Sequence, residues 1–349
     1  MAALTRPARM RIRAAATGEG RAIAALWREL WDAHETWGGY PGSRDPRVYA
    51  ELAHRLDDDA RIRAGHPVLG RHIHLVADYG GLVCGQVEGW FERHGVDPAT
   101  PFTCEVRSLV VGERARHFGA GRALLDTLSR AARDLAGAAP CVMAAEVLEP
   151  NPAMAFYARV GYAPVAWNAR IDAEAGAAAP AGRFAARIAE PRDALAIARL
   201  EILLAARRHA SGDLRFDAPR AVDPTTVDAI AAHLASAARG FALDRRDAET
   251  LVVHDRTGQV RGVASFTVHG LEPPFLPLRR GLIGRIALDP AVAVGPLLSP
   301  LLALGCKFAL SLGVSKVELT DLSQPRTELY DAALGFGASA WSRVVIRSE

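Results

Sequence analysis

The sequence repeats a pattern of glycine and aromatic residues at an offset of half its length. Gly121 lies 40 residues before Gly161, and an aromatic residue follows the second glycine. Gly295 and Gly335 reproduce this spacing 174 positions later. The chain has 349 residues, more than one hydrophobic core usually organises. The repeat therefore predicts two domains that share one fold.

Both halves show the same succession of hydrophobic periodicities. Each opens with a short strand and a helix, followed by two alternating strands that are joined by a glycine-containing turn. We therefore expect the α/β fold class, with a mixed sheet flanked by helices in each domain. The first half has expected strands at 11–13, 73–77, 82–87, 104–111, 141–148 and 162–167, with helices at 23–30, 124–135 and 152–160; the second-half hairpin is expected at 251–253 and 260–268.

A linker is predicted near the middle of the chain. The segment from Asp172 to Gly182 has no bulky apolar residue and mixes alanine, glycine and proline, as linkers do. We therefore expect one domain at 1–171, a linker at 172–183 and a second domain at 184–349.

Charge and cysteine content argue against several classes of protein. The 42 basic and 39 acidic residues leave a net charge of +3, too balanced for nucleic-acid binding by charge alone. The four cysteines lie far apart without a C-x-x-C pair, so neither a disulfide framework nor a cysteine zinc site is expected. A reducing, cytoplasmic environment fits this pattern.

Two segments bear on membrane association. No apolar run follows the arginines of the first 13 residues, so we expect no cleaved signal peptide. The most apolar stretch, 297–314, contains Pro300 and Lys307 and is more typical of a core helix than of a membrane span. We expect a soluble protein without a membrane partner.

A glycine-rich loop separates the strand at 104–111 from the helix that follows it. The loop reads R-H-F-G-A-G from Arg116 to Gly121. Glycines let backbone amides approach an anion, and the N-terminus of the helix adds unpaired donors, so a pyrophosphate would fit. Alone, this loop is weak evidence, because many strand-to-helix turns use glycine for tightness.

A second motif makes the sequence resemble the GNAT superfamily of acyl-CoA-dependent N-acetyltransferases. The loop matches the superfamily's pyrophosphate motif, Q/R-x-x-G-x-G/A, and follows the strand E-V-R-S-L-V-V. The segment N-P-A-M-A-F-Y-A-R-V-G-Y, which begins at Asn151, matches its N-x-x-A-x-x-F/L-Y-x-x-x-G-F/Y signature. The resemblance covers about residues 9–170 and, more faintly, 184–349, so the chain resembles a tandem GNAT protein.

The resemblance implies that acetyl-CoA is the co-substrate and assigns residues to it. Val110 and Val111 would present backbone groups to the pantetheine arm, beside a bulge that moves the neighbouring strand away. Asn151 would position the cofactor or its loop, and the His117 ring would contact a phosphate or point to solvent. The backbone donors for the pyrophosphate would be those of Arg116, His117, Phe118, Gly119, Ala120, Gly121 and Arg122.

Two residues are candidates for the chemistry. By the resemblance, Tyr157 would protonate the departing CoA thiolate; the alternative is a partly buried tyrosine that packs the last helix. An ammonium with a pKa of about 10 must also lose a proton before it attacks the thioester. Glu105, six residues before Val111, is the candidate base, although it alternates with Arg107 and a plain Glu–Arg pair fits equally well.

Three further residues of the first half have simpler explanations. His72 and His74 share one strand face, as metal ligands can, but no third ligand is near, so we expect no metal. Cys104 is expected to be a small buried strand residue, because direct transfer requires no nucleophile.

The segment 27–59 is rich in aromatic residues and turns, and by the resemblance it contacts the acceptor. The string L-W-D-A-H from Leu30 faintly resembles aminoglycoside N-acetyltransferases, and Asp57-Asp58-Asp59 would attract a polycation or form an acidic surface turn. The aromatic residues line a pocket or cap the core. The candidate acceptor contacts are Trp27, Trp31, His34 and Trp37.

The second half lacks these features. Its loop is four residues shorter, keeps Gly295, lacks the arginine and the second glycine, and has Pro296 where an amide donor is needed. Leu282 stands in place of the base and Asp331 in place of the acid. We therefore expect a degenerate domain that covers the sheet edge of the first or completes its substrate cleft, in a monomer resembling a dimer or in a homodimer.

The sequence thus predicts an N-acetyltransferase. It would transfer the acetyl group of acetyl-CoA directly, in a ternary complex, to a primary amine of a small molecule, aminoglycoside-like or biosynthetic. Two alternatives stay open, namely transfer from another acyl-CoA and a non-catalytic protein that senses acyl-CoA. Intact Arg116, Gly119, Gly121 and Tyr157 favour the enzyme, because a sensor needs no proton donor.

Overall fold

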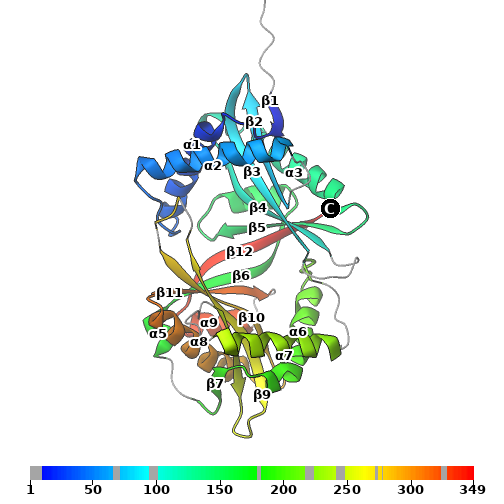
Figure 1. Ribbon diagram of the computed structural model, residues 1–349, viewed down its shortest axis with the longest axis vertical. Helices are drawn as coiled ribbons and strands as arrows, with labels where there is room; N and C mark the ends of the chain where they lie inside the picture. Colours follow the sequence, from blue (N-terminus) through cyan, green and yellow to red (C-terminus); the bar gives the residue numbers. More distant parts are fainter. Residues whose placement is uncertain are drawn as a thin grey trace, which may run out of the picture. The chain divides into compact units, whose positions relative to one another are not determined.

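The chain forms two compact units in the computed structural model (Figure 1). Unit 1 comprises Met1–Ala163, Glu272–Pro277 and Ile346–Glu349, and unit 2 comprises Pro164–Leu271 and Leu278–Val345. The structure describes residues 10–65, 71–93, 101–178, 182–216, 224–240, 248–271, 274–276, 278–323 and 328–349.

Unit 1 contains five neighbouring strands in the order β1-β2-β3-β4-β5. The first four strands are antiparallel, and β5 runs parallel to β4. Its elements are β1 (Met10–Ala14), α1 (Gly20–Thr36), α2 (Pro46–Gly65), β2 (His72–Tyr79), β3 (Leu82–Arg93), β4 (Phe102–Val111), the 3-10 turn η1 (Glu113–Ala115), α3 (Ala120–Ala136), β5 (Cys141–Leu148) and α4 (Ala153–Arg159).

Helices cover both faces of these strands (Figure 1). On one face, α3 buries Leu124, Leu125 and Leu128, and it lies so close that a Cβ on Gly89 would be 2.5 Å from the Leu128 side chain. On the other face, α1 and α2 pack with Val76 of β2 through Ile23, Ala24, Leu52, Ala53 and Leu56. Because side chains alternate along a strand, His72 and His74 share the face of Val76.

Unit 2 repeats this topology, with β7 to β11 in the places of β1 to β5. Its α8 and α9 bury one core cluster, and its α6 and α7 bury another. Its elements are β6 (Ala163–Asp172), α5 (Ala173–Ala177), β7 (Ala185–Ile188), the 3-10 turn η2 (Pro191–Asp193), α6 (Ala194–Ala210), α7 (Pro224–Gly240), β8 (Ala248–His254), β9 (Val260–Gly270), β10 (Arg279–Leu288), α8 (Val294–Ser311), β11 (Lys316–Ser323), α9 (Glu328–Gly335) and β12 (Ser339–Ser348).

The compact units do not follow the linear division expected at 172–183. Strand β6, expected as the last strand of the first domain, lies in unit 2 from Pro164 onward and pairs antiparallel with β11. Its Ala169 and Ile171 are buried in the core of that unit, which explains the assignment. Conversely, the end of the chain from Ile346 belongs to unit 1, where the Glu349 amide donates to the Cys141 carbonyl.

Part of the expected linker is folded. Asp172 caps the short helix α5 by accepting from the Glu174 amide, and Gly176 packs so closely that a Cβ there would lie 2.4 Å from the Cys306 sulfur. Close packing thus explains the small residues of this segment. Residues 179–181 lie outside the described part of the chain.

Helix α8 is long and apolar enough to cross a membrane, with 18 residues of mean hydropathy 1.5. Its Leu297, Leu298, Leu301 and Leu302 are almost fully buried in the core of unit 2. It is therefore a core helix in this fold, as expected from Pro300 and Lys307.

Candidate functional site

The parallel strands β4 and β5 separate at their C-terminal ends. Their pairing ends where Val106 faces Ala145, although β4 continues to Val111 and β5 to Leu148. Just after this point Ser108 has a φ of 51°, and the β3–β4 register shifts between Gln86 and Glu88. A bulge bends the strand that carries it, so β4 leaves β5 beside Val110 and Val111, where the resemblance implies a bulge.

The loop between β4 and α3 presents its backbone amides. Gly119 precedes α3 with a φ of 82°, a conformation that favours glycine. Among the described residues, the amides of 117–122 have no hydrogen-bond partner, whereas the Ala123 amide donates to the Gly119 carbonyl at 3.0 Å. Successive free amides at a helix N-terminus form a cradle for an anion.

The side chains of this loop turn away from the cradle or to solvent. Arg116 pairs with Glu29 at 2.5 Å and donates through Nε to the Val111 carbonyl at 3.1 Å. Arg122 pairs with Asp126 at 3.6 Å along α3. His117, with a φ of 71°, is exposed, as is Phe118. The loop therefore offers backbone rather than side-chain donors.

Helix α4 carries the second motif. Asn151 accepts from the Ala153 amide at 2.9 Å and so orders the start of α4, while Phe156 packs 3.4 Å from where a Cβ on Gly121 would lie. Tyr157 is buried against Phe156 and Tyr162, and burial raises the pKa of its hydroxyl well above 10. Tyr157 therefore stays protonated at neutral pH. Its assignment as the acid stays a prediction.

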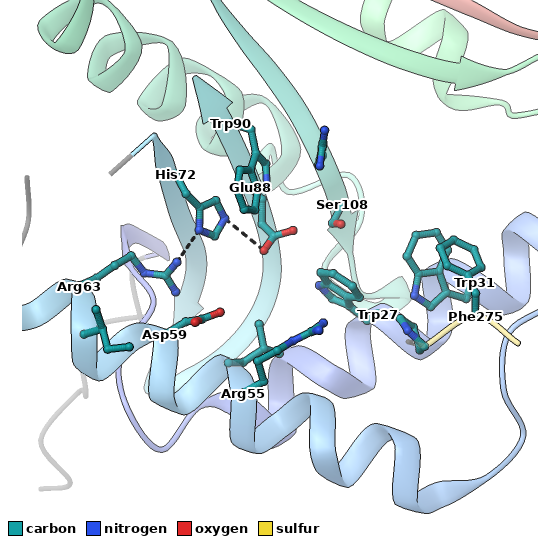
Figure 2. A pocket seen from close by; sticks show the side chains of 14 residues that line it. Trp27, Trp31, Arg55, Asp59, Arg63, His72, Glu88, Trp90, Ser108 and Phe275 are labelled. Carbon is teal, nitrogen blue, oxygen red and sulfur yellow. Dashed lines mark hydrogen bonds and ion pairs between the residues drawn. The ribbon is translucent and has the colours of Figure 1, made fainter. Parts of the chain in front are cut away.

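A cavity of about 510 Å³ opens on the other face of the sheet. Helices α1 and α2 form one side, and strands β2, β3 and β4 form the other (Figure 2). The lining residues are Trp27, Trp31, Arg55, Leu56, Asp59, Ile62, Arg63, His72, Glu88, Trp90, Arg107, Ser108, Pro274 and Phe275.

A buried carboxylate lies at the base of this cavity. Glu88 on β3 is 6% exposed, and its Oε1 is 3.3 Å from His72 Nε2. The other ring nitrogen of His72 accepts from Arg63 at 2.7 Å, because a guanidinium can only donate (Figure 2). Nε2 of His72 therefore faces Glu88 while Nδ1 faces Arg63. Burial opposes ionisation of Glu88, but the interactions with His72 and Ser108 hold its pKa below the ordinary value.

A second chain of hydrogen bonds connects the cavity to the bulge. His74 is buried, which lowers its pKa, and its Nε2 lies 2.6 Å from Gln86 Oε1. The Gln86 amide in turn donates to the Ser108 carbonyl at 2.8 Å. This chain ties the bulged residue of β4 to β2 and β3. His72 thus contacts the carboxylate of Glu88, and His74 contacts the side-chain amide of Gln86.

An aromatic wall closes the cavity. Trp27 and Trp31 lie edge to face at 5.7 Å, and Trp31 contacts Phe275 at 4.4 Å between ring centroids. Phe275 comes from the segment 274–276 between β9 and β10, which bonds to the chain at 41–43 through the Ser43 and Leu276 amides. Of the predicted acceptor contacts, Trp27 and Trp31 line the cavity, whereas His34 and Trp37 do not.

Glu105, the predicted base, lies elsewhere on the same face. Its carboxylate pairs with Arg107 at 2.6 Å, its side chain is 40% exposed, and it is not part of the cavity lining. The Glu–Arg pair that the alternation allowed is therefore formed. Cys104, the preceding residue, is fully buried, and burial raises the pKa of its thiol, as expected for a core strand residue.

The three consecutive aspartates have separate roles. Asp57 accepts from the Gly18 and Gly20 amides and so fixes the start of α1, and Asp58 pairs with Arg61 on the surface of α2. Only Asp59 of the three lines the cavity. They do not act together as an acidic patch.

The second repeat keeps the bulge and uses its loop amides internally. Arg285 of β10 has a φ of 49° at the position that corresponds to Ser108. The following loop is closed by Asp289, which accepts from the Ala291 amide at 2.9 Å and pairs with Arg261 at 2.8 Å. Pro296 stands in the first turn of α8 and has no amide donor. Among the described residues, this loop therefore offers fewer free amides than residues 117–122.

Four residues of the cavity lining were not predicted from the sequence, namely Glu88, Arg63, Phe275 and Asp59. Asp59 was considered only together with Asp57 and Asp58. Glu88 and Arg63 carry no motif, although Glu88 does alternate with Trp90 on one strand face. Phe275 could not be found from the sequence, because its segment lies far along the chain from Ser43, whose amide donates to the carbonyl of residue 274. Only the fold brings the segment 274–276 to the aromatic wall.

Comparisons with known proteins agree with this geometry. Residues 24–162 match the profile of the "Acetyltransferase (GNAT) family". A GCN5-related N-acetyltransferase from Sphaerobacter thermophilus has 17% identity and a TM-score of 0.58, over 99% of this chain and 97% of that one. A tandem GNAT protein from the clavulanic acid biosynthesis pathway has 19% identity and a TM-score of 0.52, over 98% of both chains. No curated protein matches the sequence.

The chain therefore has the tandem GNAT fold, in which one fold occurs twice. The GNAT profile matches residues 24–162, which lie in unit 1, so the likeness to this family is carried by the first repeat. GNAT proteins in general use acetyl-CoA, and the profile match supports N-acetyltransferase activity for unit 1.

Proposed function

We propose that unit 1 transfers an acetyl group from acetyl-CoA to a primary amine of a small molecule, directly and in a ternary complex. The observation that carries the proposal is the run of partner-free amides at 117–122 in the described part of the chain, which follows β4 after this strand has left β5. This run would bind the pyrophosphate, and the gap between the strands would admit the pantetheine arm.

In this reaction, a bond forms between the amine nitrogen and the acetyl carbon, and the carbon–sulfur bond of the thioester breaks. The nitrogen loses two protons, one from the ammonium before attack and one as the amide forms; one proton is taken up by the thiolate and the other is released to solvent. Glu88 is ionised at neutral pH and faces the cavity, so we assign it the role of proton acceptor, directly or through water. Tyr157, which keeps its proton, would donate to the thiolate.

The charges around the cavity do not favour an aminoglycoside-like polycation. Three arginines line it against two carboxylates, and just one of the three aspartates at 57–59 is among them. A polycation binds where negative charge is in excess. A small amine of mixed charge is therefore the better acceptor.

Release of free thiol from acetyl-CoA across a set of amines tests the proposal. The Tyr157→Phe variant separates an enzyme from a sensor: an enzyme keeps its affinity for CoA and loses roughly 100-fold or more in rate, whereas a sensor changes in neither. Thiol release with longer acyl-CoA substrates but none with acetyl-CoA would replace acetyl transfer by the alternative acyl reaction. No thiol release with any amine, together with tight acetyl-CoA binding, would favour the sensor.

A further inference from the structure

Two side chains of opposite charge in the cavity lining have no direct contact with another charged group in the part of the chain that the structure describes. Arg55 and Asp59 both line it and stand four residues apart on one face of α2. Neither forms a hydrogen bond or an ion pair with any residue that the structure describes. The other charged residues of the lining are engaged with one another or with nearby groups, in the contacts Arg107–Glu105, Arg63–His72 and His72–Glu88.

The two groups point into the same space. Figure 2 shows Arg55 and Asp59 projecting from α2 toward the strands, with the Asp59 carboxylate on the side of Glu88 and the Arg55 side chain on the side of Trp27. Burial lowers the pKa of Arg63, and the negative charge of Asp59 opposes this lowering. One available guanidinium and one available carboxylate form the complement of a zwitterion, since each binds the group of opposite charge.

Donor groups of the lining also favour a ligand that carries an acceptor. Trp27 Nε1, Trp31 Nε1 and Arg63 Nη2 are buried and have no hydrogen-bond partner among the described residues. The lining as a whole has more donors than acceptors, with three arginines and three tryptophans against two carboxylates, so a ligand that brings oxygen atoms complements it better than one that brings only N–H groups. An amine without an oxyanion would add donors alone.

The remaining surface sets the size and character of the ligand body. Trp27, Trp31, Trp90 and Phe275 contribute flat apolar surfaces to a cavity of about 510 Å³. This volume accommodates a molecule of amino-acid to small-drug size. Aromatic rings stack favourably on such a wall.

We propose that the acceptor is an amine that also carries a carboxylate and an aromatic group, of which an aromatic amino acid is the simplest form. The ammonium lies between Asp59 and Glu88, the carboxylate on Arg55, and the ring against Trp27, Trp31 and Phe275. This inference rests on the proposed acetyl transfer and names its acceptor class.

Four probes that differ in the groups they carry test the proposal in the intact chain. Phenylalanine has the amine, the carboxylate and the ring; phenethylamine lacks the carboxylate; 3-phenylpropanoate lacks the amine; and spermidine is a polycation. We expect kcat/KM for thiol release to be at least about tenfold higher with phenylalanine than with phenethylamine or spermidine, as a charge-assisted hydrogen bond implies. 3-Phenylpropanoate should inhibit without reacting.

The Arg55→Gln variant locates the carboxylate. It should lower kcat/KM for phenylalanine at least about tenfold, toward the phenethylamine value, and leave phenethylamine unchanged. The matched control is Arg61→Gln, since Arg61 lies on the same helix, pairs with Asp58 and does not line the cavity. Equal losses for both substrates in Arg55→Gln, or a preference for phenethylamine or spermidine, would overturn the acceptor class while acetyl transfer stands.

Calorimetry separates the acceptor class from the reaction. With CoA present, phenylalanine and 3-phenylpropanoate should bind, and Arg55→Gln should weaken both. Such binding without thiol release from any amine would support the site and remove the proposed reaction. Absence of both binding and turnover with every carboxylate-bearing probe would remove the acceptor class.

Discussion

The Nε2 atom of His72 lies 3.3 Å from Oε1 of Glu88, while Nδ1 of the same ring accepts from Arg63. The ring therefore connects Arg63 of α2 with Glu88 of β3, and His72 positions the Glu88 carboxylate. The arrangement places an ionised, oriented carboxylate at the base of the aromatic cavity.

The two glutamates should respond differently to substitution. Glu88→Gln keeps the shape of the side chain and removes its charge, so kcat at neutral pH should fall by roughly 100-fold, with a smaller loss at high pH where the amine is already neutral. Glu105→Gln is the matched control, because its carboxylate is partly exposed and pairs with Arg107. A large, pH-dependent loss in Glu105→Gln and none in Glu88→Gln would return the role to Glu105.

The loop before α3 depends on one glycine conformation. Gly119 has a φ of 82°, and a Cβ there would meet nothing within 4 Å, so Gly119→Ala tests backbone strain without a clash. We expect a loss of about 1 to 2 kcal/mol in the free energy of unfolding and weaker acetyl-CoA binding. Gly121→Ala is the stability control, since Gly121 lies inside α3. Denaturant unfolding that shows no difference between the variants would contradict the role of this conformation.

Each chain should bind one acetyl-CoA. In the loop of the second repeat, the Ala291 amide donates to Asp289, and Pro296 in the first turn of α8 has no amide hydrogen. Among the described residues, this loop therefore has fewer free backbone amides than residues 117–122. Calorimetric titration of the intact chain should give a stoichiometry of one, and substituting Gly119 should weaken this single site. A stoichiometry of two would show that the second repeat binds the cofactor.

Stability should fall on mild acidification because of His34. Burial lowers the pKa of this ring from 6.5 to about 4, so the unfolded chain binds its proton first as the pH falls. The contribution to stability is present above pH 6.5 and is lost between 6.5 and 4, by at most about 3 kcal/mol. His34→Gln should flatten this part of the stability profile.

Unfolding measured at several pH values checks the assignment. The exposed His54 on α2 provides the control, and His54→Gln should keep the wild-type profile. Identical profiles for all three proteins would show that His34 is not the group responsible.

The sequence predicted the repeat, the mixed sheet and the loop at 116–122, because these depend on short-range patterns of glycine and apolar residues. The alternation at Glu105 and Arg107 also indicated their pairing as one of two outcomes. The sequence did not indicate Glu88 as a site residue, because the state of its carboxylate depends on His72 from β2 and Ser108 from β4. Cross-strand neighbours follow from register, which the bulge at Ser108 shifts.

By itself, the sequence determined that one fold occurs twice. It also determined that only the first repeat has both glycines of the loop from Arg116 to Gly121. Local backbone conformation and the period of apolar residues depend on residues that are neighbours in the sequence. The repeat and the glycine loop could therefore be inferred from the sequence. Only the tertiary structure decided that β6 packs in unit 2, that Phe275 joins Trp31, and that Arg55 and Asp59 face one cavity. These relationships arise from burial and register between distant segments, which neighbouring residues in the sequence do not encode.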